Sequence, residues 1–151
     1  MKRILLSIIL ILGLGSAYSQ QLVKLAENGE WVNYYWIDGD VIKKAVNGDW
    51  VNQLWIDGEV VKRAEGGEWA NRYWIDGEVV KKALNGEWEN EMWVTEGIIK
   101  MAEGGEWANR YWKDGDVLKR AENGEWVNFA WIPESVSLKY LAVIMDDWFT
   151  D

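Results

Sequence analysis

The chain has 151 residues, enough for one domain, and it contains neither cysteine nor histidine. It can therefore form no disulfide, it lacks the common ligands of zinc, copper and haem, and it cannot build a Ser-His or Cys-His nucleophile pair. Its formal net charge of −9 argues against binding to nucleic acid or to anionic membranes, because both require basic surfaces.

Residues 1–19 have the pattern of an export signal. Lys2 and Arg3 precede an apolar run over residues 4–13, and small residues stand at Ala17 and Ser19. The run is shorter than the roughly 20 residues of a membrane span, so we expect cleavage and no transmembrane span afterwards. A retained N-terminal anchor is the alternative. An export signal at the N-terminus predicts that the protein is exported to the periplasm, the cell surface or the medium. Without Lys2 and Arg3, 14 basic and 25 acidic residues leave a net charge of −11.

A repeat of nineteen residues follows. Each unit opens on a marker of the form NGEW, NGDW or GGEW, at residues 28, 47, 66, 85, 104 and 123. The marker tryptophan is followed two residues later by asparagine, and three residues after that by a second tryptophan. Residues 22–27 match the closing half of a unit. The sequence therefore predicts a repeat array over residues 20–131.

Each unit is expected to form a β-hairpin. Residues 31–37 and 41–46 are rich in aromatic or β-branched residues, and Asp-Gly and Asn-Gly dipeptides separate such stretches. The predicted fold is all-β: an elongated antiparallel β-meander of about six hairpins. The alternative is a parallel β-solenoid with one coil per unit. It would stack Lys43 and its equivalents into a like-charge ladder, which is unfavourable.

The odd period constrains the hairpin. Two turns of two residues give an even repeat, so either one loop has an odd length or one strand carries a one-residue bulge. We expect a three-residue Ile-Asp-Gly loop, because the fourth unit moves this glycine one place later, to Gly97. Trp31 and Trp36 then lie on opposite faces. On the sheet face that carries the second tryptophan, one position varies strongly from unit to unit and is expected to face solvent. Its residues are Tyr34, Gln53, Arg72, Glu91, Arg110 and Phe129.

The last unit departs from the pattern after Trp131. Pro133 and Glu134 suit a helix start, and apolar residues between Leu138 and Phe149 fall on one helical face. A terminal repeat exposes its stacking face and its sheet edge. Residues 132–151 are therefore predicted to form a helical C-terminal cap, with an extra edge strand as the alternative.

The core of the unit, Gly-[Glu/Asp]-Trp followed by Trp-x-Asp-Gly-x-Val-x-Lys, resembles the bacterial variant of the membrane occupation and recognition nexus (MORN) repeat. The resemblance covers about residues 22–131. The unit here is shorter than the family's, and the asparagine after the marker tryptophan is not a hallmark of the family. The resemblance implies an elongated, twisted antiparallel sheet with a scaffold role and no catalysis. A weaker resemblance is to choline-binding cell-wall repeats, whose fixed Gly-Trp dipeptide is missing.

The two rows of tryptophans are expected to differ in role. The marker row and the asparagines are predicted to form the structural core of the repeats: Trp31, Trp50, Trp69, Trp88, Trp107 and Trp126, with Asn33, Asn52, Asn71, Asn90, Asn109 and Asn128. The second row has variable and charged neighbours, so it is the candidate ligand-facing row: Trp36, Trp55, Trp74, Trp93, Trp112 and Trp131.

We therefore expect an exported, non-enzymatic repeat protein, without cofactor or metal, that binds a macromolecule through its sheet surface. The partner is a protein or a polysaccharide, and a glycan could stack along an exposed tryptophan row. Self-association into an extracellular fibre is a further alternative. Asp38, Asp57, Asp76 and Asp114 are available carboxylates. They are repeated copies in turns, whereas a catalytic pair needs two distinct environments.

Overall fold

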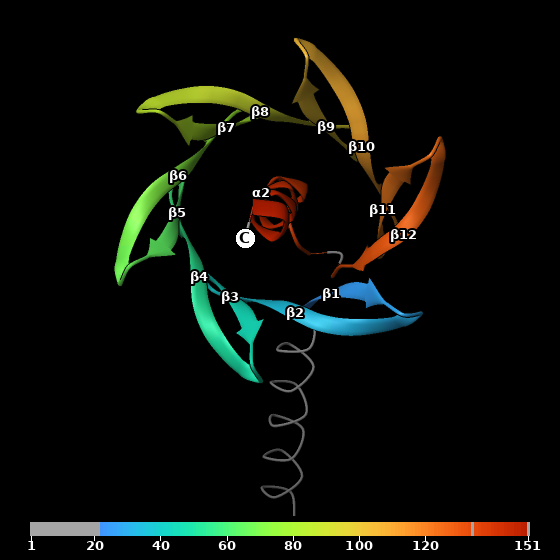
Figure 1. The fold of residues 1–151 in the computed structure, drawn as a ribbon, viewed down its shortest axis with the longest axis horizontal. Helices are drawn as coiled ribbons and strands as arrows, with labels where there is room; N and C mark the ends of the chain where they lie inside the picture. Colours follow the sequence, from blue (N-terminus) through green and yellow to red (C-terminus); the bar gives the residue numbers. More distant parts are fainter. Residues whose placement is uncertain (1–21, 134, 151) are drawn as a thin grey trace, which may run out of the picture.

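The computed structural model describes residues 22–133 and 135–150. In this part of the chain, twelve antiparallel strands close into one barrel, and a helix occupies its centre (Figure 1). The longer strands carry the markers: β2 (Glu30–Asp38), β4 (Asp49–Asp57), β6 (Glu68–Asp76), β8 (Glu87–Thr95), β10 (Glu106–Asp114) and β12 (Glu125–Trp131). The shorter strands are β1 (Leu22–Glu27), β3 (Val41–Val46), β5 (Val60–Glu65), β7 (Val79–Leu84), β9 (Ile98–Glu103) and β11 (Val117–Glu122), and the helix is α2 (Leu138–Thr150).

The hairpin repeats and the C-terminal helix are confirmed, but the elongated shape is wrong. The strand β1 pairs with β2 on one side and with β12 on the other. At this seam Lys24 faces Trp131 and Leu25 faces Ala130, just as Lys43 faces Trp36 and Lys44 faces Tyr35. Residues 22–27 therefore supply the short strand that the sixth unit lacks. Closure removes both edges that an open sheet would expose.

The seam is the shortest pairing in the barrel. It joins two residue pairs, whereas β2 and β3 join four. No hairpin turn connects β1 to β12, because they are the first and last strands, and the chain leaves the sheet after Trp131. Pro133 lacks the backbone N–H that a fourth pair would use.

The extra residue of the period lies in a strand, so the expected three-residue loop is wrong. Glu27 pairs with Glu30 across Asn28 and Gly29, and Asp38 pairs with Val41 across two residues, so both turns are two-residue turns. Val23 pairs with Tyr35 while Lys24 pairs with Asn33, which leaves Tyr34 as a one-residue bulge. The same register shift recurs in β4, β6, β8, β10 and β12.

The turns explain the glycines. Asn28 (φ 50°) and Gly29 (φ 81°) both have positive φ, as a type I′ hairpin turn requires. Gly39 (φ 61°) is the first central residue of the other turn, where type II′ places glycine. In the fourth unit this turn is Glu96-Gly97, with φ of 49° and 79°, so it takes the I′ form without changing the loop length.

Glu96 is a glutamate in a backbone conformation that favours asparagine or glycine. Glu96→Asn is expected to stabilise the protein by about 0.5–1 kcal/mol, measured as the shift of the urea midpoint by tryptophan emission. Glu59→Asn is the control, since Glu59 is the second residue of a turn in which Gly58 alone has positive φ. Equal shifts for the two variants would contradict this explanation.

The bulge also decides the faces of the sheet. Trp36 lies between the buried Tyr35 and Ile37, so it points outward, whereas Tyr34 contacts Trp148 of α2. The rings of Trp36 and Trp50 are 5.9 Å apart. Both tryptophan rows therefore lie on the outer face, and their assignment to opposite faces is wrong because the bulge reverses the alternation between them.

The core fills the barrel. One inward row has no exposed area at all: Val23, Ile42, Val61, Val80, Ile99 and Leu118. The helix packs inside this wall and is buried from Leu141 to Asp147. It is thus a central plug and not a cover over a terminal edge. Ser137 caps its start, because Ser137 Oγ accepts a hydrogen bond from the Lys139 N–H at 3.3 Å.

The predicted export signal, residues 1–19, lies outside the described residues, and so does Glu134. Among the residues that are described, no helix combines the length and the apolar character needed to cross a membrane.

Candidate functional site

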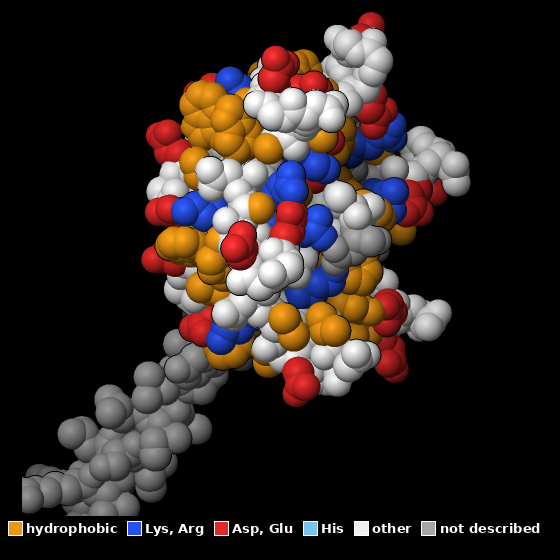
Figure 2. All heavy atoms as spheres, turned by 60° about the vertical axis from the view of Figure 1, so that its left-hand side comes forward, with side chains coloured by type: hydrophobic (Ala, Val, Ile, Leu, Met, Phe, Trp, Pro, Cys, Tyr) orange, Lys and Arg blue, Asp and Glu red, His pale blue; other side chains and the backbone are white. Residues whose placement is uncertain are grey.

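The outer face carries a repeated aromatic group that we call the outer belt. It consists of the two tryptophan rows and one lysine row: Lys24, Lys43, Lys62, Lys81, Lys100 and Lys119. Figure 2 shows apolar side chains in orange and basic side chains in blue interspersed over one side of the barrel.

One unit of the outer belt shows how it is built. Lys43 Nζ lies 4.5 Å from the centroid of the Trp36 ring and 2.9 Å from Asp38 Oδ2. Trp50 packs against Trp36 in an edge contact, with its ring inclined at 66° to that of Trp36. Trp50 lies directly opposite Ala45 on the neighbouring strand, so the small side chain leaves space for the indole.

This arrangement recurs around the barrel. Five pairs of rings have centroids 5.9–6.2 Å apart, and six lysines lie 4.2–5.0 Å from a tryptophan centroid. The fourth unit has Thr95 where the first three units and the fifth have aspartate, and there Trp93 Nε1 donates to Glu78 Oε2 at 3.1 Å. Each cation thus covers an indole of the second row.

Exposure differs between the two rows. The marker tryptophans are 36–40% exposed. The second-row tryptophans, which we expected to face a ligand, are half-buried beside their lysines. All six asparagines that follow the markers are exposed. The surface available to a partner is therefore formed chiefly by the marker indoles and these asparagines, which the sequence led us to expect in the structural core.

A second cluster of polar and charged side chains lies inside the barrel, around two acids of α2. Asp147 is fully buried and Asp146 is 8% exposed. Asp147 accepts from Tyr35 Oη at 3.1 Å and from Gln53 Nε2 at 3.0 Å, and it forms an ion pair with Arg63 Nε at 3.2 Å. These contacts satisfy a carboxylate that burial would otherwise make unfavourable.

Asp146 has its own set of partners. Tyr73 Oη donates to Asp146 Oδ2 at 2.7 Å, and Lys82 Nζ lies 2.8 Å from the same oxygen. Burial, and then the nearby Asp146 carboxylate, raise the pKa of Tyr73, so its hydroxyl remains a donor. Burial also raises the pKa of Glu91, and Asp146 adds to that effect.

In three of the six units the strongly variable position of the repeat contacts this helix, so its assignment to solvent is wrong there. Tyr34 packs on Trp148 with centroids 4.5 Å apart, Gln53 binds Asp147, and Phe129 stacks on Phe149 at 5.7 Å. Arg72 and Arg110 pair instead with Glu65 and Glu103. The variation therefore reflects equivalent positions with different surroundings, because some contact one asymmetric helix and others pair with a glutamate of the neighbouring strand.

The turn aspartates are engaged as surface ion pairs. Asp38, Asp57, Asp76 and Asp114 each lie 2.8–2.9 Å from a lysine of the outer belt. No group of three or more acids that could hold a metal ion is found among the described residues. The four carboxylates have equivalent surroundings and do not form a pair with two distinct environments.

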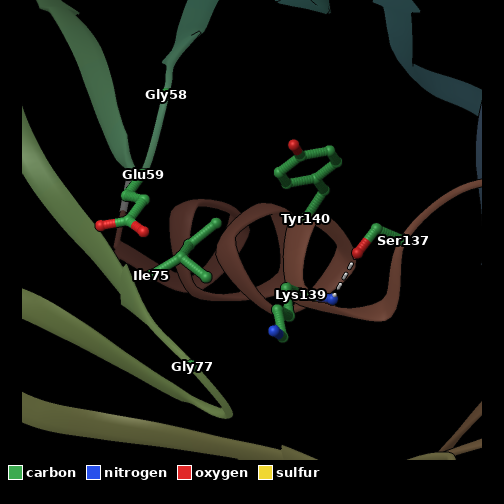
Figure 3. Close-up of a pocket in the computed structure, with 7 residues that line it drawn as sticks. All are labelled: Gly58, Glu59, Ile75, Gly77, Ser137, Lys139 and Tyr140. Atoms are coloured by element: carbon green, nitrogen blue, oxygen red, sulfur yellow. Dashed lines mark hydrogen bonds between the residues drawn. The ribbon is translucent and has the colours of Figure 1, made fainter.

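A pocket of about 290 Å³ lies at the start of the helix (Figure 3). Glycine-containing turns line one side of it, with Glu59 and Ile75, and Ser137, Lys139 and Tyr140 of the helical end line the other. The polar ends of Glu59 and Lys139 do not converge on one point (Figure 3). This arrangement lacks the converging polar groups of a typical ligand site.

Comparison of the chain with protein-family models, with curated proteins and with solved structures found no match.

Proposed function

We propose that the protein is a non-enzymatic binding module that binds a macromolecule through the outer belt. One observation carries this proposal: six marker tryptophans are more than a third exposed on the outer face, while a helix occupies the lumen. Exposed aromatic side chains repeated in this way are unusual on a soluble surface and are typical of interaction sites.

A neutral glycan chain fits this surface best. An indole face can pack on the C–H face of a sugar ring, and the exposed asparagine two residues after each marker offers both donors and acceptors to hydroxyl groups. The acidic composition disfavours polyanionic partners. A ring of equivalent weak sites would bind a repetitive polymer with an avidity greater than that of one site.

The closed barrel argues against the fibre alternative. Every one of the twelve described strands has a partner on both sides, so no free strand edge is offered to a second molecule.

The proposal is tested by titrating the protein with a panel of soluble neutral glycans while tryptophan emission is recorded. We expect at least one glycan to change the emission saturably. The triple variant Trp50→Ala, Trp69→Ala, Trp88→Ala is expected to weaken that binding by about tenfold or more, because neighbouring sites are lost together. Val51→Ala is the matched control, since Val51 is exposed and adjacent to Trp50 but points to the opposite face. No response across the panel, or equal binding by the triple variant, would refute the glycan proposal.

A further inference from the structure

A second pocket opens at the other end of the barrel, beside the last turn of α2. Its volume is about 420 Å³, and its side chains come from β9, β10, β11 and the helix: Met101, Glu103, Arg110, Tyr111, Arg120, Ala121 and Phe149. This volume lies within the range of small-molecule sites.

In an earlier unit of the repeat, the residues equivalent to two of these pocket residues bind a carboxylate inside the barrel. Tyr73 and Lys82 face each other across β6 and β7, and both contact one oxygen of Asp146, at 2.7 and 2.8 Å. A tyrosine hydroxyl and a cation on adjacent strands thus hold a carboxylate inside the barrel. We call this pair the carboxylate clamp.

The same pair recurs two units later without a carboxylate from the helix. Tyr111 and Arg120 face each other across β10 and β11, at the positions equivalent to Tyr73 and Lys82, and both line the pocket. The Arg120 guanidinium lies 4.5 Å from the Phe149 centroid, and its nearest acid among the described residues is Glu122, at 3.8 Å. That separation is too long for a hydrogen bond.

The other charged groups of the pocket do not replace the missing partner. Arg110 donates to Glu103 through both Nε and Nη2, so this acid is engaged and its pKa is lowered. The intervening unit places Met92 and Met101 at the clamp positions, so Met101 contributes apolar surface. Phe149, which is half exposed, adds an aromatic face.

We propose that Tyr111 and Arg120 bind the carboxylate of a small organic acid whose apolar body packs on Met101 and Phe149. The ligand takes the position relative to this pair that Asp146 takes relative to Tyr73 and Lys82. A guanidinium held over aromatic rings presents its N–H groups in the plane that a carboxylate oxygen requires. This site is separate from the outer belt and does not depend on the function proposed for it.

The test compares 4-phenylbutyrate with 4-phenylbutanol by calorimetric titration of the whole protein. We expect one molecule of the acid to bind per chain, and the alcohol to bind at least about tenfold more weakly, because it lacks the charge-assisted hydrogen bonds. In the ¹H–¹⁵N spectrum, the acid is expected to shift the Arg120 Nε–H resonance, which a non-specific apolar contact would not do selectively.

Two variants locate the site. Arg120→Met is expected to reduce affinity for the acid by about tenfold or more while leaving the fold intact, since Met101 already occupies the equivalent position. Arg72→Gln also removes one arginine charge, at the bulge position equivalent to Arg110 and outside the pocket, and it is expected to bind as the parent does. Absence of binding heat with the acid, equal binding of acid and alcohol, or full binding by Arg120→Met would each overturn the proposal. Loss of glycan binding in the outer-belt variants would leave this titration unchanged.

Discussion

Asp147→Ala is expected to destabilise the barrel by about 3 kcal/mol, because removing one partner of a buried ion pair leaves the other charge uncompensated. Asp147 has no exposed area and contacts Arg63, Gln53 and Tyr35 from three different strands. Each of these groups would lose an acceptor inside the protein, which is less favourable than losing it in water. The side chain of Arg63 is 17% exposed, so the loss falls at the lower end of the usual range for buried pairs.

The matched control for this variant is Asp38→Ala. Asp38 also pairs with a cation, Lys43, but its side chain is 44% exposed. Surface ion pairs of this kind contribute less than about 1 kcal/mol. Urea denaturation followed by tryptophan emission compares the two free energies of unfolding. Equal losses would show that the acid in the lumen is no more important than one at the surface.

A chain that ends at Ser135 is expected to lose its cooperative fold. A barrel of about eight strands is just wide enough for its own side chains to fill, whereas this barrel has twelve. Without α2, the inward rows, including Ile42 and Tyr73, would line an open lumen that water enters. The basic groups that now bind the helix acids would also lose their partners.

Near-ultraviolet circular dichroism and thermal unfolding report on this truncation. We expect the aromatic signal and the sharp transition to disappear. Phe149→Ala serves as the control, because Phe149 is half exposed at the end of the helix and its removal is expected to lower the melting temperature only slightly. A truncated chain that melts like the parent would show that the barrel does not need its plug.

Local features of the fold could be predicted from the sequence, and the closure could not. The Asn-Gly turns, the long and short strands and the terminal helix follow from turn chemistry and residue pattern within each unit. Closure depends on residues 22–27 meeting β12 across the whole array. One signal was present: this fragment matches the closing half of a unit, and the sixth unit lacks that half.

The position of the bulge determines which residues face outward, and the sequence does not reveal that position. A bulge and an odd loop both satisfy a nineteen-residue period, but they give opposite answers about which residues share a face. With the bulge at Tyr34 and its equivalents, both tryptophan rows face outward, and Tyr34, Gln53 and Phe129 of the variable row contact the helix. The helix has no six-fold symmetry, so equivalent positions around the barrel have different neighbours and carry different side chains.

The central claim is that the chain closes on itself around its C-terminal helix, and nuclear Overhauser effects between backbone protons across the seam test it most directly. In the closed barrel Leu25 and Ala130 face each other, so cross-strand effects between them are expected within one molecule. Effects between the Tyr73 ring and Asp146 are expected as well. Cross-strand effects along all the hairpins, with none between β1 and β12, would contradict closure and restore the open meander.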